Sequence, residues 1–358
     1  MLAASRSLPV LLCVLSLDAW GCSKGESVGA SGAGGRADAS VINVLFDAGQ
    51  GGIPGSGGVG GRASGGTSGV ALGGAGGKAD AGPKPGCTGP LKVADPNLEA
   101  AIRDELTLPT GDILPEHVAK LTSLDANGKQ IATLAGIDCL TVLASIDVGY
   151  NAITDLSPLA SLTQLRALEL RGLRTVDLTP LAPLTNLTSL SMGFNTTHIA
   201  GFGVVAGMTN LRTLEVYSAD LDDISPITGC TQMYRLMIAN NRISDVTPIA
   251  GFKKLDYLEL FANNITDISP LANMATTVRV LDLGSNHIAD ISPLGRWAGN
   301  PNLEQLDLSN NKITDLGPLL SIPHLAPWIF DLTENPIDCT AQAANIAALY
   351  RNLDTDCR

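Results

Sequence analysis

The sequence is poor in aromatic residues, in basic residues and in long apolar runs. Phe, Trp and Tyr make up only 4% of the 358 residues, so a single compact domain with a large aromatic core is not expected. Lys and Arg number 23 against 35 Asp and Glu, and the net charge of −12 argues against a nucleic-acid-binding surface. The apolar run near the N-terminus extends only from Leu8 to Leu17, which is too short to cross a bilayer.

Residues that support catalysis are also missing as a group. The histidines lie far apart, without cysteine or carboxylate neighbours at the spacing of metal ligands; they are His117, His198, His287 and His324. No Ser-His-Asp or Cys-His grouping recurs along the chain. The sequence therefore predicts a protein that is not an enzyme, with no catalytic residues, no metal site and no cofactor.

The first 22 residues have the pattern of an export signal. Arg6 precedes the apolar run, and the segment ends in Ala19-Trp20-Gly21-Cys22. This ending resembles the lipobox of bacterial lipoproteins, which implies that Cys22 is acylated and becomes the N-terminus. Ser23 in the next position then implies an outer-membrane lipoprotein. An ordinary signal peptide cut nearby and a cytosolic chain that keeps the segment are the alternatives.

Residues 23–86 hold 22 of the 39 glycines and few apolar side chains. Such a composition cannot bury enough apolar surface to offset the entropy lost on ordering. We therefore predict a disordered tether rich in Gly, Ala and Ser, which is membrane-linked only through the N-terminal lipid.

The remainder is a repeat array with the pattern L-x-x-L-x-L-x-x-N-x-I-x-D-I-x-P-L. Nine copies, spaced 22 to 25 residues apart, begin at Leu121, Leu143, Leu165, Leu187, Leu211, Met233, Leu255, Val278 and Leu303. A period this short has room for one strand, one turn and one short 3₁₀ segment, but not for a pair of helices. The copies that begin at Leu255 and Leu303 resemble the 22-residue leucine-rich repeats of internalin-type bacterial surface proteins.

This resemblance implies an α/β leucine-rich repeat solenoid over residues 121–337, with a parallel β-sheet on the concave face and 3₁₀ or irregular structure on the convex face. Such an array needs caps at both ends of its core. Residues 87–120 are predicted as the N-terminal cap, with a helix that begins after Asp95 and ends near Leu106. Residues 338–358 are predicted as the C-terminal cap, with a helix from Thr340 to Leu353.

Two polar residues recur in each repeat. Asparagine at position 9 is expected to bury its amide between coils; it occurs as Asn151, Asn195, Asn241, Asn263, Asn286, Asn311 and Asn335. Aspartate at position 13 recurs as Asp155, Asp177, Asp223, Asp245, Asp267, Asp290 and Asp315. We expect these carboxylates to accept hydrogen bonds from the N–H groups of each turn, with a calcium-binding row as the alternative.

The cysteines are consistent with export. Cys139 and Cys230 are four coils apart, about 19 Å along the stack, which is too far for a disulfide. We predict that Cys87 pairs with Cys139 and Cys339 with Cys357, and that Cys230, at a leucine position, is a buried thiol.

Positions 3, 5 and 7 of each repeat are predicted to point outward from the sheet. Position 5 forms an acidic stripe: Asp125, Asp147, Glu169, Ser191, Glu215, Met237, Glu259, Asp282 and Asp307. Aromatic and basic residues gather around Met237 and Glu259, namely Tyr217, Arg235, Tyr257 and Phe261. Exposed aromatic groups of this kind are candidate binding residues, although they can also serve only to cover the strands.

The sequence thus predicts a monomeric, exported, lipid-anchored protein of the bacterial cell envelope that binds a protein or an extracellular polymer through its concave face. A structural envelope scaffold and a cytosolic regulatory subunit are the alternatives. Internalins grip partner proteins through this face, but the present chain lacks their C-terminal wall-sorting motif, so adhesion to host cells is not expected.

Overall fold

A computed structural model describes residues 87–173, 176–194, 199–274, 277–322 and 329–349. The predicted signal, Cys22 and the predicted tether lie outside these residues. Every described residue belongs to the second of the chain's two units, residues 76–358. No helix among the described residues has the length and apolar character needed to span a membrane.

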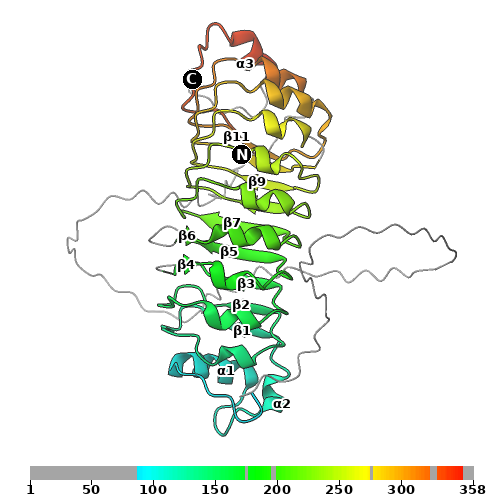
Figure 1. The fold of residues 1–358 in the computed structure, drawn as a ribbon. Coiled ribbons are helices and arrows are strands. Elements are labelled where there is room, and N and C mark those ends of the chain that lie inside the picture. The colour runs from blue at the N-terminus through cyan, green and yellow to red at the C-terminus, as the bar shows by residue number, and fades with distance from the viewer. Residues whose placement is uncertain (1–86, 174–175, 195–198, 275–276, 323–328, 350–358) are drawn as a thin grey trace, which may run out of the picture. The chain divides into compact units, whose positions relative to one another are not determined.

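The second unit is a leucine-rich repeat solenoid, as predicted (Figure 1). One strand from each coil joins a ten-stranded parallel sheet in the order β1-β2-β3-β5-β7-β8-β9-β10-β11-β12. These strands are β1 (Ser123–Asp125), β2 (Ser145–Asp147), β3 (Ala167–Glu169), β5 (Ser189–Gly193), β7 (Thr213–Tyr217), β8 (Arg235–Met237), β9 (Tyr257–Glu259), β10 (Val280–Asp282), β11 (Gln305–Asp307) and β12 (Ile329–Asp331). A second sheet pairs β4 (Val176–Asp177) with β6 (Ile199–Ala200).

The array has one more coil than the nine repeats identified in the sequence. Strand β12 pairs in register with β11, with Phe330 beside Leu306. Phe330 is buried, and Asn335 occupies the asparagine position of this tenth coil. Sequence analysis placed Asn335 at its asparagine position but identified no repeat start, because Pro327 stands at position 1 instead of an aliphatic residue.

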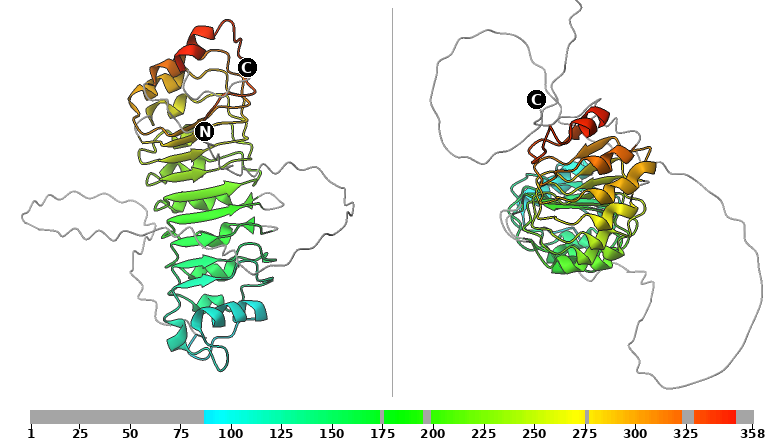
Figure 2. Two further views of the ribbon diagram at one scale, coloured as in Figure 1. Left: turned by 180° about the vertical axis from the view of Figure 1, so that it is seen from behind. Right: turned by 90° about the horizontal axis from the view of Figure 1, so that it is seen from above.

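Short 3₁₀ helices form the layer opposite the sheet (Figure 2). They span Ile137–Cys139, Ser157–Ser161, Thr179–Leu181, Phe202–Gly207, Ser225–Gly229, Thr247–Ile249, Ser269–Asn273, Ser292–Gly299 and Gly317–Ser321. The eighth repeat, from Val278 to Leu303, is 25 residues long, and most of its extra residues, around Ala298 to Asn300, lie in the helix Ser292–Gly299. Trp297 at its end is fully buried and donates a hydrogen bond from Nε1 to Leu271 O over 3.1 Å.

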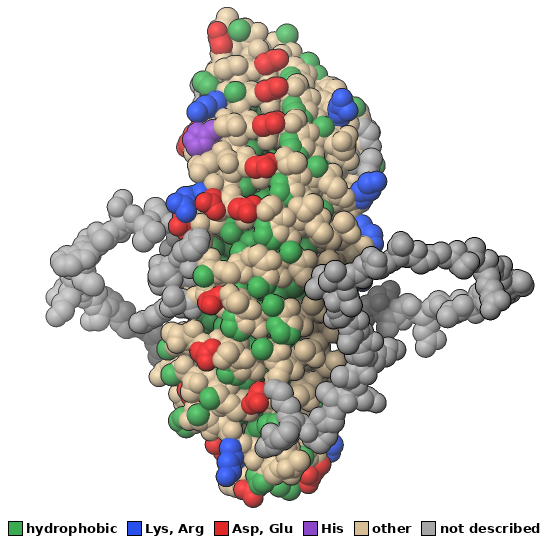
Figure 3. Space-filling model, viewed as in Figure 1, with side chains coloured by type: hydrophobic (Ala, Val, Ile, Leu, Met, Phe, Trp, Pro, Cys, Tyr) green, Lys and Arg blue, Asp and Glu red, His purple; other side chains and the backbone are tan. Residues whose placement is uncertain are grey.

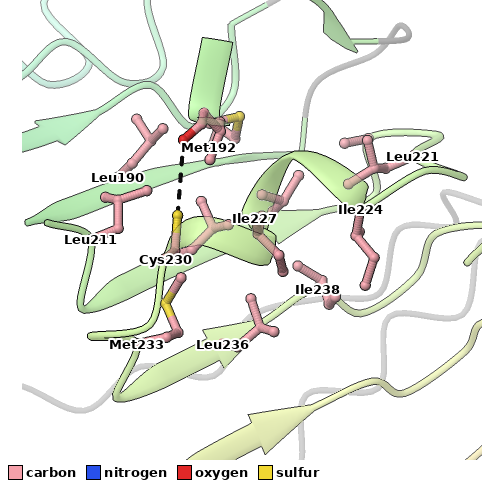
Figure 4. Packing of buried hydrophobic residues seen from close by; sticks show 14 of the residues in the cluster. Leu190, Met192, Leu211, Leu221, Ile224, Ile227, Cys230, Met233, Leu236 and Ile238 are labelled. Atoms are coloured by element: carbon pink, nitrogen blue, oxygen red, sulfur yellow. Dashed lines mark hydrogen bonds between the residues drawn. The ribbon is translucent and has the colours of Figure 1, made fainter. Parts of the chain in front are cut away.

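The core is a continuous row of aliphatic side chains between the two layers. Cys230 replaces a leucine there and is a free, buried thiol, as predicted. Its side chain lies among Leu211, Ile227 and Met233 (Figure 4), and Sγ is 3.6 Å from Met208 O. Burial raises the pKa of this thiol to about 11, so Cys230 is not a reactive cysteine.

The asparagines at position 9 link adjacent coils, as predicted for those that the structure describes. Asn286 is typical: Oδ1 accepts from Ile265 N on the preceding coil over 3.0 Å, and Nδ2 donates to three carbonyls, those of Leu260, Leu283 and Gly284. The same pattern holds for Asn151, Asn241, Asn263, Asn311 and Asn335. Asn195 lies outside the described residues. Each buried amide therefore satisfies backbone groups that would otherwise lose their hydrogen bonds.

The aspartates at position 13 accept hydrogen bonds from the turns, as expected. Each Oδ1 accepts from the backbone N–H two residues later, over 2.7 to 2.9 Å. The residue that donates this N–H is the first residue of the 3₁₀ helix, as in Ser225, which donates to Asp223 Oδ1. A row of acidic side chains follows the array on the side shown in Figure 3.

One backbone feature was not predicted. Position 8 has a left-handed conformation in all ten coils, with φ between 50° and 69°. Its occupants are Gly128, Tyr150, Gly172, Phe194, Ser218, Asn240, Ala262, Ser285, Asn310 and Glu334. Left-handed φ is costly for any residue except glycine, most of all for β-branched ones. Valine, isoleucine and threonine are indeed missing from this position.

Helices cap both ends. Helix α1 (Pro96–Leu106) begins after Asp95, whose Oδ2 also accepts from Ala132 N on the first coil over 2.7 Å. A second helix, α2 (Pro115–Val118), precedes the array. Cys87 and Cys139 are joined by a disulfide, with their Cα atoms 5.5 Å apart.

The C-terminal helix, α3 (Ala343–Leu349), contacts the last 3₁₀ helix and is shorter than predicted over the described residues. Cys339 is disulfide-bonded. Cys357 lies outside the described residues, so the pairing of these two cysteines stays a prediction.

Candidate binding surface

The outward face of the ten-stranded sheet carries the predicted acidic stripe. Parallel pairing places position 5 of each coil directly beside position 5 of the next, as in Glu259, Asp282 and Asp307. Asp331 on β12 extends the row. Neighbouring strands lie about 4.8 Å apart, so successive carboxylates repel one another unless a cation or a proton intervenes.

A cation intervenes in the N-terminal half of the stripe. Arg171 forms an ion pair with Glu169 at 3.1 Å and lies 3.9 Å from Glu215. Ser191 replaces an acidic residue between these two glutamates and donates a hydrogen bond to Glu215 Oε2 over 3.1 Å. One guanidinium thus lies close to two of the acidic residues in this part of the stripe.

The predicted aromatic and basic residues meet in the middle of the sheet. Tyr217 and Tyr257 both donate hydrogen bonds to Glu259 Oε2, over 3.3 and 3.4 Å. The guanidinium carbon of Arg235 lies 4.7 Å from the centre of the Tyr257 ring, which is a cation–π contact. Arg235 Nη2 also lies 3.7 Å from Met237 Sδ. The side chains therefore hold one another in place before any partner binds.

Aromatic exposure extends beyond the predicted residues. Phe194 stacks on Tyr217, with ring centres 5.6 Å apart, and is 53% exposed. Phe261 is 38% exposed, and Tyr150 is the most exposed at 54%. Sequence reasoning missed Phe194 and Tyr150 because it considered positions 3, 5 and 7, whereas both lie at position 8. We refer to Phe194, Tyr217, Arg235, Met237, Tyr257, Glu259 and Phe261 as the sheet-face patch.

Burial changes the electrostatics of the patch. It raises the pKa of Glu259 above its usual value, whereas the hydrogen bonds from Tyr217 and Tyr257 lower it. Burial and the charge of Glu259 raise the pKa of Tyr257 to about 12 and raise that of Tyr217 further. Both phenols therefore stay protonated and act as hydrogen-bond donors across the physiological pH range.

Beyond the patch the stripe has no cation within the sheet. Burial and the charge of Asp307 raise the pKa of Asp282 to about 7, with smaller contributions from Glu259 and Asp331. Positions 3 and 7 of the coils of β10 and β11 are Val280, Gly284, Gln305 and Ser309, none of them basic. Among the described residues no group of three or more His, Cys, Asp or Glu is arranged to hold a metal ion.

Together, the single-strand coils, the buried asparagines and the patterned sheet define a leucine-rich repeat protein. The family profile described as "Leucine Rich repeats (2 copies)" matches residues 235–273 and 276–321. An internalin from Listeria monocytogenes, InlF, is 27% identical, with a TM-score of 0.56 over 73% of this chain and 88% of that one. The protein is therefore internalin-like.

Two further solved structures are similar. The functional domain of InlJ from Listeria monocytogenes, which includes a cysteine ladder, is 26% identical with a TM-score of 0.55; the match covers 73% of this chain and 55% of that one. A leucine-rich repeat protein from Leptospira interrogans shares the fold at 19% identity, with a TM-score of 0.50 and 62% of each chain covered. No curated protein sequence matches this chain.

Proposed function

We propose that the protein is a binding module, not an enzyme, and that it binds a partner protein through the sheet-face patch. The observation that carries the proposal is the stack of exposed Phe194 on Tyr217, whose hydroxyl is bonded to Glu259, with exposed Phe261 on the same coil as Glu259. Aromatic side chains that are preorganised on a rigid sheet lose little entropy on binding and are typical of interface hot spots.

The carboxylates beside the patch define the chemistry of the partner. Asp282, Asp307 and Asp331 follow one another without a cation on the sheet. A basic side chain of the partner would relieve their repulsion while an apolar group contacts Phe194 and Phe261. Charge and aromatic contact together favour a basic protein surface; an extracellular polymer is the second candidate for the same face.

We further propose that the mature protein is exported and anchored to the outer membrane of a bacterium through acylated Cys22, with residues 23–86 as the tether. The lipobox-like ending of residues 1–22 and the disulfide of Cys87 with Cys139 support this location. The intact mass of the protein extracted from membranes of its host tests the proposal. A chain that begins at Cys22 with added acyl groups is expected, whereas an unmodified chain that begins at Met1 would favour the cytosolic alternative.

Photo-crosslinking tests the binding site. A photoreactive amino acid at position 261 should form a discrete protein adduct in the host, and Tyr217→Ala should abolish that adduct. The same amino acid at position 320, an exposed leucine in the opposite layer, is the matched control. Identical adducts from both positions would rule out the patch. A structural scaffold predicts instead that the purified protein assembles as its concentration rises, which sedimentation velocity detects.

A further inference from the structure

A groove lies at the edge of the sheet where its strands begin, and no residue of the sheet-face patch lines it. It lies beside the start of strands β3, β5, β7 and β8 and has a volume of about 640 Å³. Its charged residues are Arg166 and Arg212, and the others are glutamine, asparagine, threonine and glycine. No carboxylate lines the groove, although the chain contains 35 acidic residues and only 23 basic ones.

Both arginines are available for a ligand. Each occupies position 2 of its coil, and neither guanidinium has an ion pair or hydrogen bond to any residue that the structure describes. Arg279 occupies the same position further along the array but is bonded to Asp256 and Glu304. The free state of Arg166 and Arg212 is therefore not a general property of this position.

The floor of the groove is rigid and rich in amides. Asn186 Nδ2 donates to Thr163 O over 2.9 Å, and Asn210 Nδ2 donates to Thr185 O over 3.0 Å. These bonds hold the amides in a row and leave their oxygens as acceptors. Gln164 and Gln232 continue the row on both sides, and Gln232 Oε1 already accepts a hydrogen bond from Lys254 Nζ.

We propose that this groove binds an acidic polysaccharide, with the two arginines on its anionic groups and the amide row on its hydroxyls. Arginine pairs in two parallel hydrogen bonds with carboxylate or sulfate. The arginines are two coils apart, about 10 Å along the array, which is similar to the length of one disaccharide in an extended polymer. A polymer with one acidic group on every second sugar matches this spacing.

The residues that line the groove disfavour a nucleic acid or a protein as its ligand. Single-stranded nucleic acid needs aromatic side chains on which to stack its bases, and none lines the groove. A protein interface needs an apolar centre, and no aliphatic side chain lines the groove either. Rows of hydroxyl and amide groups suit a ligand that carries many hydroxyls.

The test measures binding of hyaluronan oligosaccharides, which carry one carboxylate per disaccharide, to the full mature chain by calorimetry. We expect binding that weakens as salt rises and that falls at least about 30-fold in the double variant Arg166→Gln, Arg212→Gln. Neutral dextran oligosaccharides should not bind, and inorganic phosphate should compete only weakly. Tyr217→Ala should bind hyaluronan normally, so this site and the sheet-face patch can be judged separately.

The matched control is the double variant Arg242→Gln, Lys312→Gln, which removes the same charge at exposed position 10 residues outside the groove. Its affinity should stay within about two-fold of the original. Equal losses in the two double variants would mean nonspecific attraction and would overturn the proposal. So would wild-type affinity in the arginine variant, failure of hyaluronan to bind, or equal binding of dextran.

Discussion

The hydroxyl of Tyr217 donates a hydrogen bond to Glu259 over 3.3 Å, although 42 residues separate them in the sequence. The two residues belong to the coils of β7 and β9, so the bond passes over the coil of β8. Ala239 occupies the equivalent of Tyr217 on that middle coil and is only 4% exposed. Its small side chain lets the tyrosine extend across, and three coils are thereby linked at the centre of the patch.

Replacement of Tyr217 by phenylalanine tests this link. Tyr217→Phe keeps the ring that stacks on Phe194 but removes one of the two phenols that donate to Glu259. We expect the free energy of unfolding to fall by about 1 kcal/mol, measured by urea denaturation. Tyr150→Phe is the control, because the Tyr150 hydroxyl has no hydrogen bond within the described residues. Equal effects of the two substitutions would contradict the link.

Substitution of a buried asparagine should destabilise the protein more strongly. Asn286→Ala leaves Ile265 N and the carbonyls of the coils without their partner, so the free energy of unfolding should fall by about 2–4 kcal/mol. Asn264→Ala removes an exposed asparagine whose amide makes one long bond, to Arg242 O at 3.4 Å. That control should change stability by less than about 0.5 kcal/mol. A loss at Asn286 no larger than at Asn264 would show that the buried amides are dispensable.

The left-handed position gives a stabilising substitution. Ala262 has a φ of 53°, a conformation that glycine adopts without a steric cost. Ala262→Gly should therefore raise the free energy of unfolding by about 0.5 kcal/mol, since relief of strain exceeds the added entropy of the unfolded chain. At Ala239, which has ordinary φ and is buried, the same substitution should destabilise. Thermal unfolding of both variants measures these changes in stability. Destabilisation by Ala262→Gly would contradict the inference that the backbone is strained at Ala262.

Position 8 also shows which part of the structure was predictable. The apolar period fixes which side chains are buried, so the strands, their register and the stripe from Asp125 to Asp307 follow from spacing alone. A left-handed backbone at a solvent-facing position leaves only a weak signal in the sequence, namely the absence of β-branched residues. Phe194 was therefore missed. Its contact with Tyr217 was missed as well, because the left-handed backbone sets the direction of the Phe194 ring.

Three other features of the structure were not predicted from the sequence, each for a physical reason. The tenth coil has Pro327 at position 1, so its asparagine, Asn335, was recognised in the sequence but its strand was not. The insertion of the eighth repeat lengthens a 3₁₀ helix because Trp297 supplies enough apolar surface to bury one additional turn. The groove of Arg166 and Arg212 was not predicted because its residues come from the end of one repeat and the start of the next, and only the stacked coils bring them together.

The disulfide of Cys87 with Cys139 should stabilise the N-terminal cap. It closes a loop with a sequence separation of 52, for which loop entropy alone gives an upper value of about 4 kcal/mol. The double variant Cys87→Ala, Cys139→Ala should lose about 2–4 kcal/mol of unfolding free energy under oxidising conditions. Because a reductant also acts on Cys339, the variant is compared with the original chain in both redox states. A variant as stable as the oxidised original chain would contradict the role of the bond.

The acidic stripe predicts that the array becomes more stable as the pH falls from 8 to 5. The pKa of Asp282 is raised to about 7 in the folded chain, because burial and the charges of Asp307, Glu259 and Asp331 disfavour its ionised form. In the unfolded chain the pKa is about 3.9. The folded state therefore binds the proton more tightly, so the associated stability is complete below pH 4 and is lost as the pH rises through 7.

Asp282→Asn separates this effect from the others. The asparagine Oδ1 can still accept from Gly284 N, which donates to Asp282 over 3.0 Å, but the side chain no longer carries a charge. We expect the variant to be more stable than the original chain by about 1–2 kcal/mol at pH 8 and to differ little from it at pH 4. The turn aspartates, such as Asp155 and Asp290, have lowered pKa values and lose their stabilising effect only below pH 4, outside this window. Urea denaturation at a series of pH values measures how the free energy of unfolding of each protein changes with pH. The same change with pH in both proteins would contradict the raised pKa of Asp282.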